Sequence, residues 1–304
     1  MPVIKRARQN KPSGQWLVLA AAVLWGTTGT AQAFAPDGAQ PASVGAVRLV
    51  VGGFTLLLFA AVRGAFRGQK QWLSSVSVTA AVCIALYQLC FFAGVARTGV
   101  AVGTIVAIGS APIFAGLLGL PVRGERPGWR WGIATTLAVL GCAFLIADSG
   151  ELRVNLSGLL LALGAGLAYA TYAVASKGLL EKQPPEAAMA IVFSLGAVLL
   201  LPVLVTSDLT WIATPRGLGV AIHLGLVTTA LAYILFARGL RLIPVATAVS
   251  LSLAEPLTAA LLGLIVLGEQ HTPLAFIGIG LILSGLLTLS RNPVIFHKPS
   301  GMPN

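Results

Sequence analysis

The chain alternates long apolar runs with short polar connectors. An apolar α-helix of about 20 residues crosses the roughly 30 Å hydrocarbon core of a bilayer. Ten runs have about this length, and helix-breaking prolines such as Pro36, Pro127 and Pro184 lie in the connectors. The predicted spans cover residues 16–35, 43–62, 76–96, 99–121, 129–147, 157–176, 187–206, 217–237, 244–267 and 273–290. The pattern therefore predicts an all-α integral membrane protein with ten transmembrane helices.

The second half of the chain repeats the first at a spacing of 144 residues. Segments 112–125 and 256–269 both fit P-x-x-A-x-L-L-G-L-x-V-x-G-E and share nine of 14 residues. A longer alignment without gaps, 92–145 against 236–289, keeps 16 of 54 positions identical. An internal duplication thus extends over several helices.

The duplication divides the chain into two five-helix units, residues 16–147 and 157–290. Residues 1–15 and 291–304 form terminal tails. Because five is odd, the second unit enters the membrane from the opposite side to the first, and we predict inverted repeats.

The first span has an alternative interpretation as a cleavable signal peptide. Basic residues such as Lys5 and Arg6 precede it, and Ala31-Gln32-Ala33 lies near its end, as at a cleavage site. The apolar run is long for a signal peptide, and its removal would break the five-plus-five repeat. We therefore expect a retained helix.

The distribution of basic residues predicts the orientation. Of 20 Lys and Arg residues, 16 fall in the two tails, in alternate connectors or, for Arg130, at the adjoining start of the fifth span. The other connectors contain only Arg97, Arg153 and Arg216, and Arg48 lies within the second span. Cytoplasmic loops are enriched in Lys and Arg. Both termini are therefore predicted to be cytoplasmic, in a bacterial-type inner membrane.

Composition supports a membrane protein and excludes several classes of function. The chain is 57% hydrophobic and 10% charged, with a mean hydropathy of +0.90, far more apolar than a soluble domain. The net charge of +11 comes from isolated basic residues without interleaved aromatics, so no nucleic-acid partner is predicted.

Motifs for metals, cofactors and catalysis are missing from the sequence. Its three cysteines and three histidines have no metal-ligand spacing, and we predict neither a metal nor a cofactor. G-x-S-x-G, H-E-x-x-H and P-loop motifs are also absent. We predict a protein that is not an enzyme and does not hydrolyse ATP.

The ten spans, the paired P-x-x-A-x-L-L-G-L-x-V-x-G-E segments and the Glu255-Pro256 dipeptide resemble the EamA-like branch of the drug/metabolite transporter superfamily. The resemblance covers residues 16–290. Within the branch, the chain is most similar in overall character to the YddG-type exporters of aromatic and other amino acids. This resemblance implies an inner-membrane exporter whose central cavity is lined mainly by the third, fourth, eighth and ninth helices.

Inverted repeats predict transport by alternating access, because the two halves can exchange conformations around a central site. We predict a secondary transporter that binds a small-molecule substrate, contacts membrane lipids and exports amino acids, including aromatic ones. An exporter of drugs or other metabolites is one alternative, and a membrane scaffold or sensor that moves no solute is another. The sequence makes no prediction of oligomeric state.

Glu255 is the leading candidate site residue because it lies near the centre of the ninth span. A carboxylate there costs about 2.5–3.5 kcal/mol on insertion scales, so it should face a cavity, find a partner or be protonated. It could bind a substrate amine or couple protons, or it could be a protonated packing element beside Pro256.

Arg48 lies five residues into the second span. It could bind a substrate carboxylate or extend its side chain to the membrane surface. The other candidates for substrate binding are aromatic, amide or hydroxyl side chains near span centres, where rings with polar tips suit an amphipathic solute. They are Trp25, Tyr87, Gln88, Tyr169, Tyr233 and Ser252.

Two pairs of repeated residues have predicted conformational roles. Pro112 and Pro256 are candidate kinks or hinges, because proline removes a helix hydrogen bond. Gly124-Glu125 and Gly268-Glu269 close the fourth and ninth spans, where we expect the glycine to end the helix and the acid to cap or pair locally, with a transport gate as the alternative.

Overall fold

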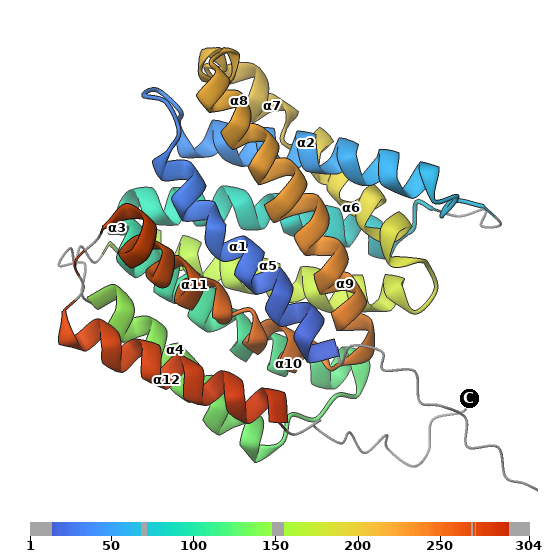
Figure 1. Ribbon diagram of the computed structural model, residues 1–304. Coiled ribbons are helices and arrows are strands. Elements are labelled where there is room, and N and C mark those ends of the chain that lie inside the picture. Colours follow the sequence, from blue (N-terminus) through green and yellow to red (C-terminus); the bar gives the residue numbers. More distant parts are fainter. Residues whose placement is uncertain (1–13, 68–71, 148–154, 269, 271, 292–304) are drawn as a thin grey trace, which may run out of the picture.

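The computed structural model describes residues 14–67, 72–147, 155–268, 270 and 272–291, and the regular secondary structure among them is entirely helical. The two predicted terminal tails, residues 1–15 and 291–304, lie almost wholly outside the described residues. The helices are α1 (Gly14–Ala33), α2 (Pro41–Val62), α3 (Ser75–Arg123), α4 (Trp129–Ala147), α5 (Leu156–Leu180), α6 (Pro185–Leu199), α7 (Leu201–Thr206), η1 (Thr210–Ala213), α8 (Pro215–Ile222), η2 (His223–Leu231), α9 (Ala232–Leu242), α10 (Val245–Leu251), α11 (Ala254–Leu262), η3 (Gly263–Leu267) and α12 (Pro273–Arg291) (Figure 1). The predicted all-α fold class is confirmed.

Seven helical segments within the described residues are long and apolar enough to cross a membrane. The segments Trp129–Leu145 and Pro185–Leu199 are apolar but shorter. Large apolar side chains on the outside, such as Phe54 with 69% of its surface exposed, suit a lipid environment. The structure therefore has the apolar helices of a multi-pass membrane protein, with fewer long spans than the ten predicted.

α3 joins two spans that the sequence analysis predicts as separate helices. It has 49 residues, and its one non-helical residue is Gly99, with φ +83° and ψ 160°. A straight helix of that length would extend about 74 Å, more than twice the hydrocarbon core. The left-handed φ of Gly99, which glycine adopts without steric cost, divides α3 into two membrane-spanning segments, Ser75–Gly99 and Val102–Arg123.

The predicted spans of the second half are interrupted. α6 ends before α7 near Pro202, which has no N–H to continue the helix. The span from α8 to α9 runs through the π-helical segment η2. The next span is divided into α10 and α11, where Pro256 lies in the first turn of α11.

The helices of the two halves have corresponding neighbours. α5 lies along α3, as α1 lies along α9 and α11, while α2 packs on α6 and α4 packs on α12 (Figure 1). Close glycine contacts repeat at the sequence spacing of 144. Gly141 approaches the backbone of Gly278, and Gly285 approaches that of Ala134, so each contact maps onto the other when the halves are exchanged. The duplication is therefore visible in the packing.

Candidate functional site

A small cavity of about 50 Å³ lies where α1, α2, α3, α5, α9, α10 and α11 meet. Seven of the eight predicted substrate-binding candidates line this cavity, and Gln88 does not. The full lining is Trp25, Thr28, Arg48, Tyr87, Ala107, Ile108, Ala111, Tyr169, Tyr233, Val249, Ser252 and Glu255. Helices from both halves of the chain thus bring most of the candidate residues together.

Aromatic rings form the apolar wall of the cavity. The ring centroids of Trp25 and Tyr233 lie 4.9 Å apart, and those of Tyr87 and Tyr169 lie 5.4 Å apart. Tyr233 also packs on Phe193 at 4.3 Å, which extends the cluster into the core. Since these rings hold one another in place, the cavity has a preformed aromatic surface.

Arg48 and Glu255 face this cavity without forming a salt bridge with each other. The Arg48 side chain lies at the cavity, so the structure does not place it in the predicted surface-directed orientation. Its buried Nε has no hydrogen-bond partner. The cavity therefore presents a guanidinium and a carboxyl group to the same enclosed volume.

The helix break beside Pro256 places Glu255 at the cavity. α10 ends at Leu251, and the Glu255 N–H donates to the Ser252 carbonyl at 2.9 Å across the break. The Ser252 hydroxyl donates to the Ala248 carbonyl at 3.2 Å. Glu255 is thus held at the start of α11, facing the cavity.

Nearby polar side chains have structural partners instead. The Trp131 indole N–H donates to the Ser250 hydroxyl at 2.9 Å, and Thr135 is within 2.8 Å of the same hydroxyl. The Tyr172 hydroxyl donates to the Met189 sulfur at 3.4 Å in the core. These contacts join α4 to α10 and α5 to α6, and they do not line the cavity.

Gln88 and Pro112 lie outside the cavity. Gln88 follows Tyr87 on α3 but lines a separate groove at the end of the bundle. Successive helical residues point about 100° apart, so neighbours in sequence can face different spaces. Pro112 lies within the uninterrupted second segment of α3, and its role as a hinge stays a prediction.

A cluster around Glu125 is the main feature that the sequence analysis assigned incorrectly. Gly124 ends α3 as expected, with φ +67°. Glu125, however, does not pair within its loop. Its Oε2 accepts the Val245 N–H at 2.8 Å and its Oε1 lies 3.3 Å from the Lys177 Nζ, so it joins the first half of the chain to α10 and α5 of the second.

Lys177 completes this cluster by donating to the Ile243 carbonyl. The Glu125 and Lys177 side chains are only 11% and 13% exposed. The repeated Gly-Glu ending and a lysine at the end of an apolar span were sequence signals for such a contact. The partners themselves are about 50 and 120 residues away, and only the tertiary structure brings them together.

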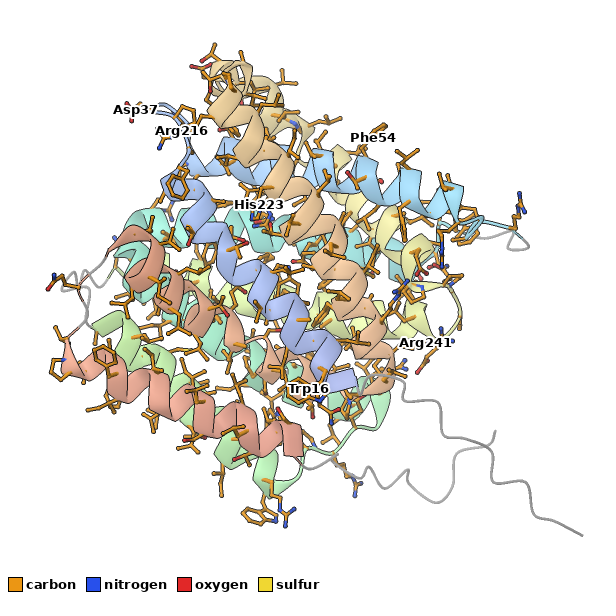
Figure 2. All side chains as sticks on the ribbon, in the orientation of Figure 1. Trp16, Asp37, Phe54, Arg216, His223 and Arg241 are labelled. Atoms are coloured by element: carbon orange, nitrogen blue, oxygen red, sulfur yellow. The ribbon has the colours of Figure 1, made fainter. Side chains whose placement is uncertain are left out.

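The salt bridges among the described residues gather at this end of the bundle. Arg123 pairs with Glu181 across the two halves, and Arg238 pairs with Glu186 within the second half. Figure 2 places Arg241 and Trp16 at this same end, with Asp37 and Arg216 at the opposite end. These ion pairs therefore lie at the end that contains Glu125.

No cluster of three or more His, Cys, Asp or Glu side chains able to hold a metal ion occurs within the described residues. The cavity offers one carboxyl group, one guanidinium and several hydroxyls. This set suits hydrogen bonding and ion pairing with an organic ligand better than metal coordination.

The model of the EamA-like transporter family matches residues 12–147 and again residues 156–291. A solved crystal structure superimposes with a TM-score of 0.79 at 21% identity, covering 90% of this chain and 95% of the other. This likeness supports the fold. The two family matches differ by 144 residues at both ends, the same spacing as the internal repeat.

Related proteins of known sequence are named as transporters. The "Uncharacterized transporter YwfM" of Bacillus subtilis is 49% identical over 91% of this chain and 93% of its own. The "Probable terminal-alkyne amino-acid exporter" of Streptantibioticus cattleyicolor is 24% identical over 95% of this chain and 97% of its own. The "Threonine/homoserine exporter RhtA" of Escherichia coli is 35% identical, over 49% of this chain and 50% of its own.

The family matches, the transporter relatives and the apolar helices together identify a multi-pass transporter of the bacterial inner membrane. Membership of a transporter family is consistent with the predicted lack of enzymatic activity. The chain belongs to the EamA-like transporter family.

Proposed function

We propose that this protein is a secondary carrier that exports amino acids by alternating access. The observation that carries the proposal is the pair of unlike charges, Arg48 and Glu255, facing one cavity without a salt bridge between them. A charged side chain inside a membrane is costly unless it has a partner or a function. An amino acid supplies a partner to both groups.

In the proposed complex, the Arg48 guanidinium binds the substrate carboxylate and Glu255 binds its ammonium group. Arginine binds carboxylates through two parallel hydrogen bonds, which fixes the orientation of the ligand. The substrate side chain then lies against Trp25, Tyr87 and Tyr169. The names of two relatives, an amino-acid exporter and a threonine/homoserine exporter, support this substrate class.

The volume of the cavity favours small amino acids over aromatic ones. A space of about 50 Å³ holds only a few water molecules, since one water needs roughly 10–15 Å³ measured in the same way. A small amino acid such as threonine therefore requires less widening of the cavity than tryptophan does. We propose that aromatic amino acids are the poorer substrates.

We propose ten membrane-spanning segments arranged as inverted repeats with cytoplasmic termini. The corresponding helix neighbours, the glycine contacts spaced by 144 residues and the two family matches support a duplicated unit. Five segments in each unit, with α3 counted as two, would insert the units in opposite directions. The distribution of basic residues supports a cytoplasmic location for the Glu125 end.

The Glu125 cluster is the proposed cytoplasmic gate. It connects the end of α3 in one half to α5 and α10 in the other, so an inward opening between the halves must break it. The repeat-related positions of Lys177 and Val245 are Ala33 and Ala101, so the opposite end has no lysine at the position equivalent to Lys177. The position equivalent to Lys177 therefore offers no cation for such a pair, which supports an outward-facing resting state.

Uptake of radiolabelled amino acids into proteoliposomes tests the proposal. The panel contains Thr, homoserine, Met, Phe and Trp, measured with and without an imposed pH gradient. We expect saturable uptake that is fastest for Thr and homoserine. Arg48→Gln should weaken uptake of amino acids, and Glu255→Gln should abolish uptake or uncouple it from pH.

Glu186→Gln is the matched control, because it removes a carboxylate that pairs with Arg238 away from the cavity. Loss of transport in this control as well would show a general effect of charge removal. Normal transport by both cavity variants would refute the assigned roles of Arg48 and Glu255. Failure of the folded protein to move any amino acid would favour a drug or metabolite exporter, or a scaffold or sensor.

A further inference from the structure

A second and much larger space lies at the end of the bundle opposite the Glu125 cluster. It has a volume of about 510 Å³, within the range of ligand-binding pockets, and lies between the start of α2, the end of the first segment of α3 and the α6–α7 junction. Its lining residues are Gln40, Pro41, Ala42, Gly45, Ala46, Gln88, Leu89, Phe92, Ala93, Val95, Ala96, Leu200 and Val203. We refer to this space as the lateral groove.

Small residues line part of the lateral groove, and the missing side chain of Gly45 lets the Phe92 ring pack against α2. The repeat-related positions of Gly45 and Ala96 are Met189 and Leu240, and both of these larger side chains are completely buried. The halves therefore differ here. One half packs methionine and leucine where the other has glycine and alanine, and the glycine and alanine line the lateral groove.

The length of the lateral groove matches one leaflet of a bilayer. It follows α3 over the nine residues from Gln88 to Ala96, whose Cα atoms span about 12 Å along an α-helix. Ala96 lies three residues before the break at Gly99, where α3 reaches the end of its first span. Half of a hydrocarbon core is about 15 Å. The groove thus extends from the membrane surface to near the midplane.

The lateral groove is continuous with the lipid-facing surface. Leu89 on its wall is 44% exposed, and Pro41 and Ala42 at its rim are exposed as well. The wall is apolar apart from Gln40 and Gln88. Apolar cavities stay free of water, so the surrounding hydrocarbon is the phase that fills this one.

We propose that the lateral groove binds an acyl chain of a phospholipid from the leaflet opposite the Glu125 end. The acyl chain enters beside Leu89 and packs on Phe92 and Ala93. The amide of Gln40 at the rim then donates a hydrogen bond to the ester carbonyl of the lipid. Burial of methylene groups between helices replaces contacts that the empty groove lacks.

The bound lipid contacts both halves of the carrier, since α2 and α3 belong to the first and Leu200 and Val203 to the second. It would therefore act as a wedge between α2 and α7. An exchange of conformations between the halves would have to expel or move the bound acyl chain. The lipid would therefore stabilise the conformation described here.

Two substitutions that fill the lateral groove test the proposal. Ala42→Phe and Ala93→Phe place a ring at the rim and on the wall, and Ala61→Phe is the matched control, because Ala61 is an exposed alanine at the other end of the same helix as Ala42. Native mass spectrometry after partial delipidation measures retained phospholipid. We expect about one retained lipid for the native protein and Ala61→Phe, and none for the double variant.

Photo-crosslinking with a phospholipid that has a diazirine on its acyl chain tests the position without any mutation. We expect adducts to concentrate in peptides that cover residues 41–46 and 88–96. Equal lipid retention by all variants, or adducts spread evenly over lipid-facing peptides such as those of α12, would overturn the proposal.

Discussion

Neutralising Lys177 or Glu125 should open the Glu125 end of the protein. The perturbations are Lys177→Met, which keeps an unbranched side chain but removes the charge, and Glu125→Gln, which keeps the shape but weakens the acceptor. Each leaves one partner of a largely buried pair behind, since the side chains are only 11% and 13% exposed. A nearly buried charge that loses its partner is strongly destabilising.

The magnitude follows from the contacts that are lost. A hydrogen bond to a charged group contributes about 1.5–3 kcal/mol. Glu125 makes one such bond to the Val245 N–H at 2.8 Å and an ion pair with Lys177 at 3.3 Å. Loss of about 1.5–3 kcal/mol from the closed state alone shifts the ratio of closed to open protein by roughly 10- to 150-fold. The double variant should cost less than the sum of the single variants, because the two side chains share one interaction.

Hydrogen–deuterium exchange in nanodiscs measures this opening directly. The amide of Val245 is protected by Glu125, so exchange should rise in peptides covering the start of α10 and the end of α5. Glu186→Gln is the control, because the Arg238–Glu186 pair lies within one half and does not join the two halves. Its exchange at α10 should match that of the native protein.

Unchanged exchange at Val245 in both Lys177→Met and Glu125→Gln would refute the gate. Equal increases along every helix would show global destabilisation instead, since a gate acts only where the halves separate. Additive effects in the double variant would also contradict the argument, because they would mean that Glu125 and Lys177 act independently.

Two further predictions concern glycines, each with a control in the same region. Gly141→Ala should destabilise the protein by about 1–3 kcal/mol and so lower its thermal unfolding temperature, because the new methyl group would overlap the backbone of Gly278. Gly132→Ala is the control on the same helix: its methyl group meets open space, and the substitution should be neutral or mildly stabilising. Gly124→Ala should destabilise by about 1–2 kcal/mol, because Gly124 has φ +67°, whereas Gly128→Ala should change the unfolding temperature much less. Equal unfolding temperatures within either pair would contradict the steric or conformational explanation.

Some interruptions of the helices could be anticipated from the sequence, and others could not. Gly99 and Pro202 are recognisable helix breakers, yet the sequence analysis made the first the start of a span and left the second inside another. The π-helical segments η2 and η3 contain no proline, and their glycines, Gly225 and Gly263, do not have a positive φ. Gly225 lies against Val51 of α2, a contact between distant parts of the chain that local sequence does not specify.

By itself, the sequence determined the membrane environment, the duplication and the composition of the site. These follow from local properties, because the length of an apolar run, the spacing of repeated motifs and the cost of Glu255 inside a bilayer need no knowledge of neighbours. The residue types near span centres were therefore enough to select seven side chains that line one cavity.

Only the tertiary structure decided which way each side chain faces and which distant residues meet. Tyr87 and Gln88 are adjacent in sequence, but a rotation of about 100° between them places one at the central cavity and the other in the lateral groove. Glu125 looked like a local cap, yet its partners are Val245 and Lys177 of the other half. Helix rotation and contacts between the halves depend on how all the helices pack together, and that packing is a property of the whole chain.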